Sequence, residues 1–130
     1  MDNSNQKKPS PQALERRQFI NLTTFRKNGQ PVVTTVWFAM ENGKIYGTSK
    51  TSSGKVKRIR NNPQVTFAPS SMGGKELGGA CPGKMRQLPP EEYPQAIAAL
   101  KHKYGLQFTL FSFFGRGQGG SDIFWEIIPD

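Results

Sequence analysis

Two Asn-Gly pairs in the first third of the chain most constrain its fold. Each pair separates two segments rich in Thr, Val, Ile and aromatic residues, a composition typical of β-strands. Asn-Gly is the strongest short signal for a two-residue hairpin turn, in which both residues have positive φ. The pairs Asn28-Gly29 and Asn42-Gly43 therefore predict a three-stranded antiparallel meander over Gln18–Phe25, Val32–Met40 and Lys44–Thr48.

The rest of the chain carries signals for two helices and three more strands. Val56 and Ile59 share one side of a basic segment, and Pro63 terminates that segment. Gly105 follows apolar residues at helical spacing and ends a second helix. In chain order, the sequence predicts a helix at Gly54–Asn61, a strand at Gln64–Ala68, a loop at Pro69–Gly83, a strand at Lys84–Leu88, a helix that opens at Pro89, an aromatic stretch at Phe108–Phe114, a glycine-rich run at Gly115–Gly120 and a strand at Ser121–Ile128.

This element order restricts the fold class. Strands that follow one another in mostly antiparallel order exclude a doubly wound parallel sheet, and a small closed or split barrel removes their exposed edges. The length of 130 residues suits one domain. We expect a mainly β (α+β) fold, a six-stranded antiparallel barrel over residues 15–130 with two helices, preceded by a disordered arm over residues 1–14.

The composition predicts a cytoplasmic protein. Met1–Gln12 is polar and lacks the apolar core of a signal peptide. No apolar run approaches the ~18 residues that a membrane span needs. The single cysteine, Cys81, lies in the predicted loop and has no partner for an internal disulfide, which fits a reducing compartment.

The charge of the chain and its basic helix favour an anionic ligand. A formal charge of +9 attracts phosphates, nucleic acid or acidic lipids. The start of a helix offers unpaired N–H groups and the positive end of a dipole, and Ser52 or Ser53 can cap it. Lys55 and Lys57 add full charges, while Gly54 permits a close approach to the backbone. The alternative is a solvated basic helix face with a serine cap.

Other candidate residues give weaker signals. Trp37 and Trp125 are either core or interface residues, or an aromatic wall for a flat ring. His102 is the only histidine and lies off the apolar stripe of its helix, so we expect it at the surface. The sequence contains no recognisable nucleophile with its base and no cluster of metal ligands. It therefore identifies no catalytic acid or base and no metal site.

A longer segment resembles a known family. Residues 21–69 read NLTTFRKNGQPVVTTVWFAMENGKIYGTSKTSSGKVKRIRNNPQVTFAP. This segment is similar to the split β-barrel proteins related to pyridoxamine 5′-phosphate oxidase, most of all to the branch of oxidoreductases that use a deazaflavin, coenzyme F-420. The likeness covers Phe19 to Pro69 and, more loosely, Asp122–Pro129. It implies a split barrel of the FMN-binding type.

The resemblance implies a homodimer that binds FMN, or alternatively the deazaflavin coenzyme F-420, in a cleft between the two barrels. In such proteins the second strand lines the isoalloxazine ring, the third strand lies near the ribityl chain and the phosphate, and the next helix start binds the phosphate. The matching cofactor-binding positions here are Thr35, Val36 and Trp37 for the ring, Thr48 and Ser49 for the ribityl chain and phosphate, Ser53, Gly54 and Lys55 for the phosphate-binding signature, and Lys57 and Arg58 on the next turn.

The resemblance further implies a flavin-type oxidoreductase that transfers hydride to or from a small molecule of unidentified structure. Members that oxidise pyridoxamine 5′-phosphate carry further basic residues on the second strand and a substrate-binding arginine near the C-terminus. Here Val32–Phe38 has no basic residue and no arginine follows Trp125. Vitamin B6 oxidase activity is therefore not expected.

A non-catalytic module is the alternative from another functional class. It would store or sense a flavin, or bind single-stranded nucleic acid through basic and stacking aromatic residues. Lys55–Arg60 contains no aromatic residue and Phe108–Phe114 contains no charge, which disfavours nucleic acid. The expected partners are a flavin-type cofactor, a small-molecule substrate and a second copy of the chain, without a membrane.

Overall fold

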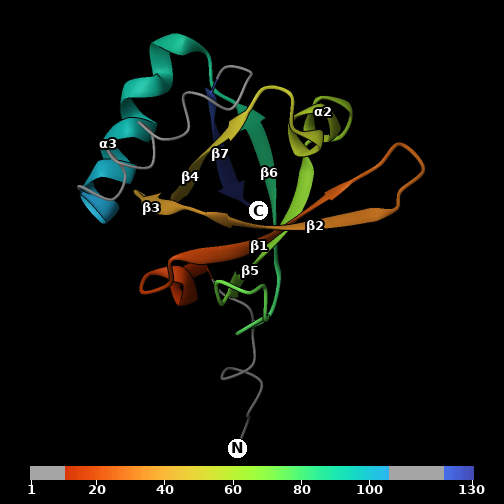
Figure 1. The fold of residues 1–130 in the computed structure, drawn as a ribbon, viewed down its shortest axis with the longest axis horizontal. Helices are drawn as coiled ribbons and strands as arrows, with labels where there is room; N and C mark the ends of the chain where they lie inside the picture. Colours follow the sequence, from red (N-terminus) through yellow and green to blue (C-terminus); the bar gives the residue numbers. More distant parts are fainter. Residues whose placement is uncertain (1–10, 106–121) are drawn as a thin grey trace, which may run out of the picture.

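A curled antiparallel sheet of seven strands dominates the computed structural model, which describes residues 11–105 and 122–130 (Figure 1). The mainly β, split-barrel class that the sequence predicts is confirmed. Phe108–Phe114 and Gly115–Gly120 lie outside the described residues. Within the described ranges, no helix is both long and apolar enough to span a membrane. In chain order the elements are the 3-10 helix η1 (Pro11–Leu14), β1 (Phe19–Phe25), β2 (Pro31–Trp37), β3 (Ala39–Glu41), β4 (Lys44–Lys50), α2 (Gly54–Asn61), β5 (Gln64–Ser70), β6 (Cys81–Gln87), η2 (Pro90–Glu92), α3 (Tyr93–Tyr104) and β7 (Asp122–Pro129).

The two edge strands of this sheet are consecutive in the sequence. The strand order is β2-β1-β5-β6-β7-β4-β3, and only Phe38 separates β2 from β3. The sheet therefore curls, so that its two edge strands are the two halves of one segment that bends at Phe38. The predicted strand Val32–Met40 is divided in two, so six predicted strands become seven. Its first half pairs with β1 and its second half with β4.

Tyr104, at the end of α3, holds the bend. The Phe38 N–H donates to the phenol oxygen of Tyr104 at 3.2 Å, and that oxygen lies 2.5 Å from the Phe38 carbonyl oxygen. The backbone of Phe38 thus forms hydrogen bonds without a strand partner. Its side chain is fully buried in the barrel. These contacts satisfy the buried backbone groups that a break in a strand would otherwise leave unpaired.

The two Asn-Gly turns differ. Asn42 and Gly43 have φ of 53° and 77°, which confirms the predicted two-residue turn. At the first pair only Gly29 has positive φ, because the Gly29 N–H donates to the Arg26 carbonyl and the Gln30 N–H donates to Asn28 Oδ1. The prediction of positive φ at Asn28 was wrong. Its side chain stabilises a longer loop in which a left-handed glycine follows an ordinary turn.

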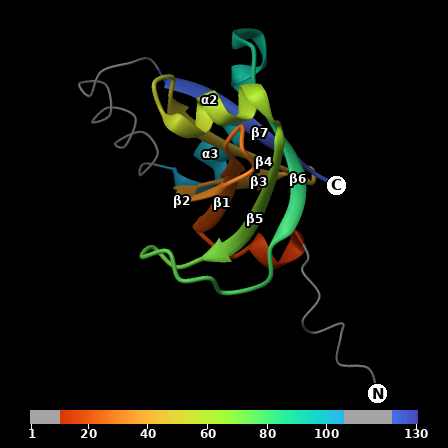
Figure 2. The same ribbon diagram turned by 90° about the vertical axis from the view of Figure 1, so that its right-hand side faces the viewer.

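Apolar side chains form one cluster inside the barrel and another between the sheet and α3. Figures 1 and 2 show α2 near the top of the barrel in both views. Val56 and Ile59 of α2 are buried in the inner cluster, as the helical spacing predicts. The inner cluster contains Leu14, Ile20, Leu22, Phe38, Ile45, Val56, Ile59, Val65, Phe67, Cys81, Met85, Ile123, Trp125 and Ile127.

Several boundaries differ from the sequence predictions, and two of the differences change the environment of a side chain. Strand β6 begins at Cys81 instead of Lys84, and Cys81 is buried in the inner cluster instead of lying in a loop. Burial raises the pKa of its thiol. The predicted disordered arm also extended too far, because Pro11–Leu14 form η1 and Leu14 is only 1% exposed.

A buried carboxylate ties three strands together on the outer side of the sheet. Glu126 of β7 is 1% exposed and lies between Tyr46 of β4 and Arg86 of β6 in the sheet. Arg86 Nε donates to Glu126 at 2.8 Å, and the same guanidinium binds Glu92 at 2.6 Å. Burial, followed by the charge of Glu126, raises the pKa of the Tyr46 phenol. Arg86 thus pairs with one carboxylate oxygen of Glu126, while Lys44 lies 3.9 Å from the other.

We expect Arg86→Met to lower the free energy of unfolding by about 3 kcal/mol, because it leaves the Glu126 carboxylate buried without its partner. Urea denaturation measures this loss. Lys84→Met is the matched control on the same strand, since Lys84 pairs with Asp130 at an exposed position. The control should cost less than about 1 kcal/mol. Equal losses would mean that Arg86 contributes no more than a surface ion pair.

Candidate functional site

A cavity of about 310 Å³ lies where β2, β4, α2 and α3 approach one another. It brings together six of the predicted site residues, which come from three separate segments of the chain. Two further lining residues, Phe19 and Leu100, were not predicted as site residues. The cavity is lined by Phe19, Thr35, Val36, Trp37, Thr48, Ser49, Lys55 and Leu100.

One wall of this cavity is apolar and rigid. Trp37 stacks on Tyr104 with ring centroids 4.9 Å apart and an interplanar angle of 13°. Phe19 meets Trp37 edge to face at 6.1 Å. The Tyr104 ring is itself fixed by the hydrogen bonds of its phenol to Phe38. Leu100 adds an aliphatic surface. Such a wall suits a flat, apolar ring.

Among the described residues, three with hydroxyl groups line the cavity, and each hydroxyl has a defined hydrogen-bond partner. Thr48 Oγ1 donates to the Ile123 carbonyl at 2.8 Å. Thr35 Oγ1 donates to Asn21 Oδ1 at 2.7 Å. Ser49 Oγ instead accepts the indole N–H of Trp125 at 3.0 Å. The hydroxyls of Thr48 and Thr35 therefore donate to acceptors within the protein, whereas the hydroxyl of Ser49 accepts a hydrogen bond.

The start of α2 concentrates positive charge beside the cavity. Burial, and then the nearby charge of Arg58, lower the pKa of Lys55. Arg58 Nε donates to Thr24 Oγ1 at 2.6 Å, which anchors the guanidinium. A Cβ at Gly54 would lie 2.6 Å from Arg58 Nη1, so the glycine admits this side chain over the first helical turn. Two cations thus lie together without a carboxylate partner among the described residues.

Ser53 occupies the N-cap position, but its side chain does not cap the helix. Its hydroxyl is buried and has no hydrogen-bond partner among the described residues. The prediction of a serine cap was therefore wrong, and Ser52 is exposed. An unpaired buried hydroxyl costs free energy unless a ligand satisfies it. Together with Lys55 and Arg58, this orphan group fits the phosphate of a cofactor.

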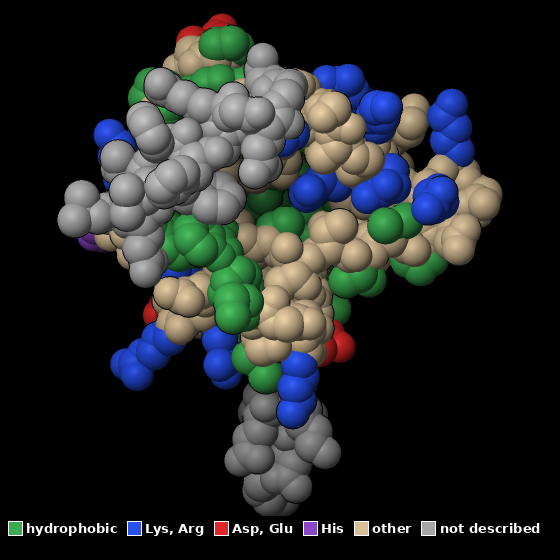
Figure 3. Space-filling model, viewed as in Figure 1, with side chains coloured by type: hydrophobic (Ala, Val, Ile, Leu, Met, Phe, Trp, Pro, Cys, Tyr) green, Lys and Arg blue, Asp and Glu red, His purple; other side chains and the backbone are tan. Residues whose placement is uncertain are grey.

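Lys57 lies apart from these residues. It is exposed and does not line the cavity, unlike Lys55. Residues two apart on a helix are separated by a rotation of about 200° around the helix axis. The side chains of Lys55 and Lys57 therefore point to nearly opposite sides and cannot both face one site. Figure 3 shows the basic side chains of this region gathered on one side of the molecular face. Of the five predicted phosphate residues, Ser53, Gly54, Lys55, Lys57 and Arg58, only Lys55 lines the cavity.

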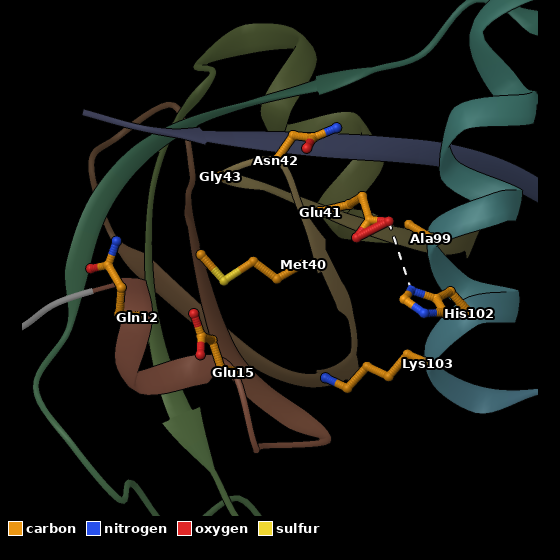
Figure 4. A pocket seen from close by; sticks show the side chains of 9 residues that line it. All are labelled: Gln12, Glu15, Met40, Glu41, Asn42, Gly43, Ala99, His102 and Lys103. Carbon is orange, nitrogen blue, oxygen red and sulfur yellow. Dashed lines mark ion pairs between the residues drawn. The ribbon is translucent and has the colours of Figure 1, made fainter.

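A second cavity, of about 400 Å³, lies between η1, the β3–β4 turn and α3 (Figure 4). Glu15 and Glu41 line it, and His102 Nδ1 lies 3.8 Å from a carboxylate oxygen of Glu41. Lys103 lies 3.7 Å from the centroid of the Phe38 ring, and burial lowers its pKa to about 8. Carboxylates repel a phosphate, and the described residues that line this cavity include no Phe, Tyr or Trp. The smaller cavity is therefore the better candidate for a phosphorylated ring compound.

The described residues include no group of three or more His, Cys, Asp or Glu that could hold a metal ion. His102 is an exposed side chain, as its position off the apolar stripe predicts. Phe19 could not be identified as a lining residue from the sequence, because an aromatic residue at the start of a strand is common and does not by itself indicate a site. The helical spacing of apolar residues in α3 predicted only that Leu100 is buried, not that it lines a cavity.

Comparison with known proteins places this geometry in a family. The sequence model described as pyridoxamine 5′-phosphate oxidase matches residues 10–125. No curated protein matches the sequence. Solved structures share the fold. A heme storage protein, HutZ from Vibrio cholerae, has a TM-score of 0.69 at 15% identity and covers 95% of this chain and 90% of its own.

Two further structures are named for flavin-type cofactors. An FAD-binding protein from Mesorhizobium loti has a TM-score of 0.66 at 20% identity, covering 92% of this chain and 86% of its own. An F420 reductase has a TM-score of 0.60 at 18% identity, covering 94% and 95%. These likenesses show the fold, while the match over residues 10–125 shows the family. The chain belongs to the pyridoxamine 5′-phosphate oxidase family.

Proposed function

We propose that this protein is a flavin-type oxidoreductase that binds FMN, or alternatively the deazaflavin coenzyme F-420, in the 310 Å³ cavity. One observation carries the proposal: a flat apolar wall around Trp37 faces the same cavity as the cationic start of α2. A ring with a phosphorylated side chain needs both features. The family match and the names of the FAD-binding protein and F420 reductase support it.

Each end of the cavity has a distinct role in this proposal. Trp37, Phe19 and Leu100 hold the ring, and the rigid stack on Tyr104 orients it. Lys55, with the neighbouring Arg58 and the hydroxyl of Ser53, binds the phosphate. The bound cofactor supplies the hydride chemistry. Lys55 is the only titratable side chain among the described lining residues, so we assign no general acid or base.

The same lining bears on the substrate. A phosphorylated substrate such as pyridoxamine 5′-phosphate would need a cation of its own beside the cofactor. Among the described lining residues Lys55 is the only cation, and the proposal assigns it to the cofactor phosphate. We therefore propose a small, uncharged or weakly charged hydride donor or acceptor. A cytoplasmic location accords with the single, buried Cys81.

A non-catalytic flavin carrier is the second candidate. The observation that favours it is the absence of any acid or base other than Lys55 among the described lining residues. A carrier and an enzyme would bind the cofactor through the same residues. Turnover with a bound cofactor separates them, because a carrier would leave the reduced cofactor unable to pass hydride to any acceptor except dioxygen or an artificial dye.

We expect FMN or the deazaflavin coenzyme to raise the melting temperature of the protein by several degrees. A ligand at a hundred times its dissociation constant stabilises the folded state by about 2.7 kcal/mol. Riboflavin should stabilise much less, since it leaves Ser53 and Lys55 without a phosphate. Pyridoxal phosphate, which lacks the tricyclic ring, should also be weak. Differential scanning fluorimetry measures the melting temperature with each of the four ligands.

Three outcomes of this measurement would contradict parts of the proposal. Equal shifts from riboflavin and FMN would remove the phosphate assignment. No shift from any flavin or deazaflavin would exclude the oxidoreductase and the carrier together. A shift with short oligonucleotides alone would favour a nucleic-acid-binding module.

Lys55→Ala should weaken FMN binding by about 1.5–3 kcal/mol, the range for a hydrogen bond to a charged group. Lys57→Ala is the matched control on the same helix and should change it by less than about 0.5 kcal/mol. Titration calorimetry measures both. Burial lowers the pKa of Lys55, so affinity should fall as pH rises through that lowered pKa, before ordinary lysines titrate. Similar losses from both variants would place the phosphate elsewhere.

We propose that the protein is a homodimer whose interface covers the outer side of β1 and β2. Val33 is 58% exposed and points to the same side of β2 as Thr35 of the cavity. Met72 is 78% exposed, in a loop held to this side by a hydrogen bond from Asn21 to the Gly74 carbonyl at 2.8 Å. Exposed apolar groups beside a ligand cavity are typical of an interface.

Sedimentation should give a species of twice 14.5 kDa, and Val33→Glu should shift it to the monomer because a charge would be buried in the interface. The same variant should weaken FMN binding. Ile128→Glu is the control, since Ile128 is 45% exposed but lies on β7. A wild-type protein that sediments only at 14.5 kDa would refute the dimer.

A further inference from the structure

Trp125 is held in one orientation by the backbone of a neighbouring strand. It is fully buried, and its ring lies over Gly47 of β4, with which it pairs in the sheet. A Cβ at Gly47 would lie 2.1 Å from the indole ring, so only glycine leaves room for it. The indole N–H consequently points at one place, the Ser49 hydroxyl, 3.0 Å away.

This contact determines what Ser49 can offer to a ligand. An indole N–H can only donate, so Ser49 Oγ is the acceptor and its own proton remains available. That proton has no acceptor within residues 11–105 and 122–130, and Ser49 lines the cavity together with Lys55. The hydroxyl is therefore directed to donate into the cavity.

Thr48 and Thr35 present the opposite polarity. Their protons are donated to the Ile123 carbonyl and to Asn21 Oδ1, so their oxygens can only accept from a ligand. Among the three hydroxyls of the described lining residues, Ser49 alone is a donor. A phosphate group has acceptors and, when fully ionised, no donor. Of these three hydroxyls, Ser49 is thus the one that matches it.

We propose that Trp125 is a positioning residue, which fixes Ser49 as a hydrogen-bond donor to the phosphate of the bound cofactor and so sets the preference for phosphorylated over unphosphorylated ligands. This inference rests on the proposed flavin-type function of the cavity. Lys55 lines the same cavity and supplies the charge, and Ser49 supplies a directed hydrogen bond. The sequence places these residues far apart, and β4 and β7 bring Ser49 and Trp125 together.

The affinities of FMN and riboflavin, measured by fluorescence titration, test the proposal. Trp125→Phe removes the N–H and keeps an aromatic ring, so it should weaken FMN binding about three- to tenfold and riboflavin binding less than about twofold. Ser49→Ala should reduce the FMN-to-riboflavin preference at least as much. The double variant should show no greater loss of preference than Ser49→Ala alone, since Trp125 acts through Ser49.

A second substitution separates the hydrogen bond from packing. Benzothienylalanine at position 125 replaces the N–H by sulfur in a ring of nearly the same shape, so it retains the fold where Trp125→Phe destabilises it. It should reproduce the lost preference. Equal weakening of FMN and riboflavin, or additive effects of the two single variants, would show that Trp125 has a packing role only.

The wild-type protein distinguishes failure of this inference from failure of the proposed function. A wild-type preference for FMN that survives both changes at Trp125 overturns the inference and leaves the function intact. A wild-type protein that binds neither flavin is tested with coenzyme F-420 and its unphosphorylated core in the same way. Binding of none of the four ligands overturns the function and the inference together.

Discussion

The bend at Phe38 is the constraint on which the rest of the structure depends. A long strand that continued straight would pair along one edge only and leave the sheet open. Because Tyr104 satisfies the backbone of Phe38, the chain turns there and its two halves join both edges of the sheet. The same contact fixes the Tyr104 ring under Trp37. The curl of the sheet and the aromatic wall of the cavity therefore depend on the same contact between Tyr104 and Phe38.

The cavity takes its chemical character from residues of the sheet, α2 and α3 that line it. Its hydroxyls are oriented by groups on strands β1 and β7, and its cations are set by the short helix that follows β4. All of these groups lie on strands or on α2. A ligand site on regular elements is held more precisely than one on loops. We therefore expect a ligand to bind in this cavity without a free-energy cost for ordering these strands and this helix.

The sequence predicted those features that follow from local rules. The turn at Asn42-Gly43, the buried face of α2 and the antiparallel class each depend on residues close together in the chain. The break at Phe38 could not be predicted, because its cause is a side chain 66 residues later. The same holds for the cavity, since Leu100 enters it from α3. The free hydroxyl of Ser53 escaped prediction because capping rules describe an average helix start, while this one is surrounded by cations.

The position of β7 has a consequence for the order in which the molecule assembles. This strand lies in the sheet between β6 and β4, although a long stretch of chain separates it from β4. Until it is present, the β3–β4 hairpin has no strand to join it to β6. Pairings over such sequence separation make folding slow, because much chain entropy is lost before the contacts form. The candidate cavity, whose Thr48 and Ser49 hydroxyls are oriented by β7, therefore forms only once this long-range pairing is made.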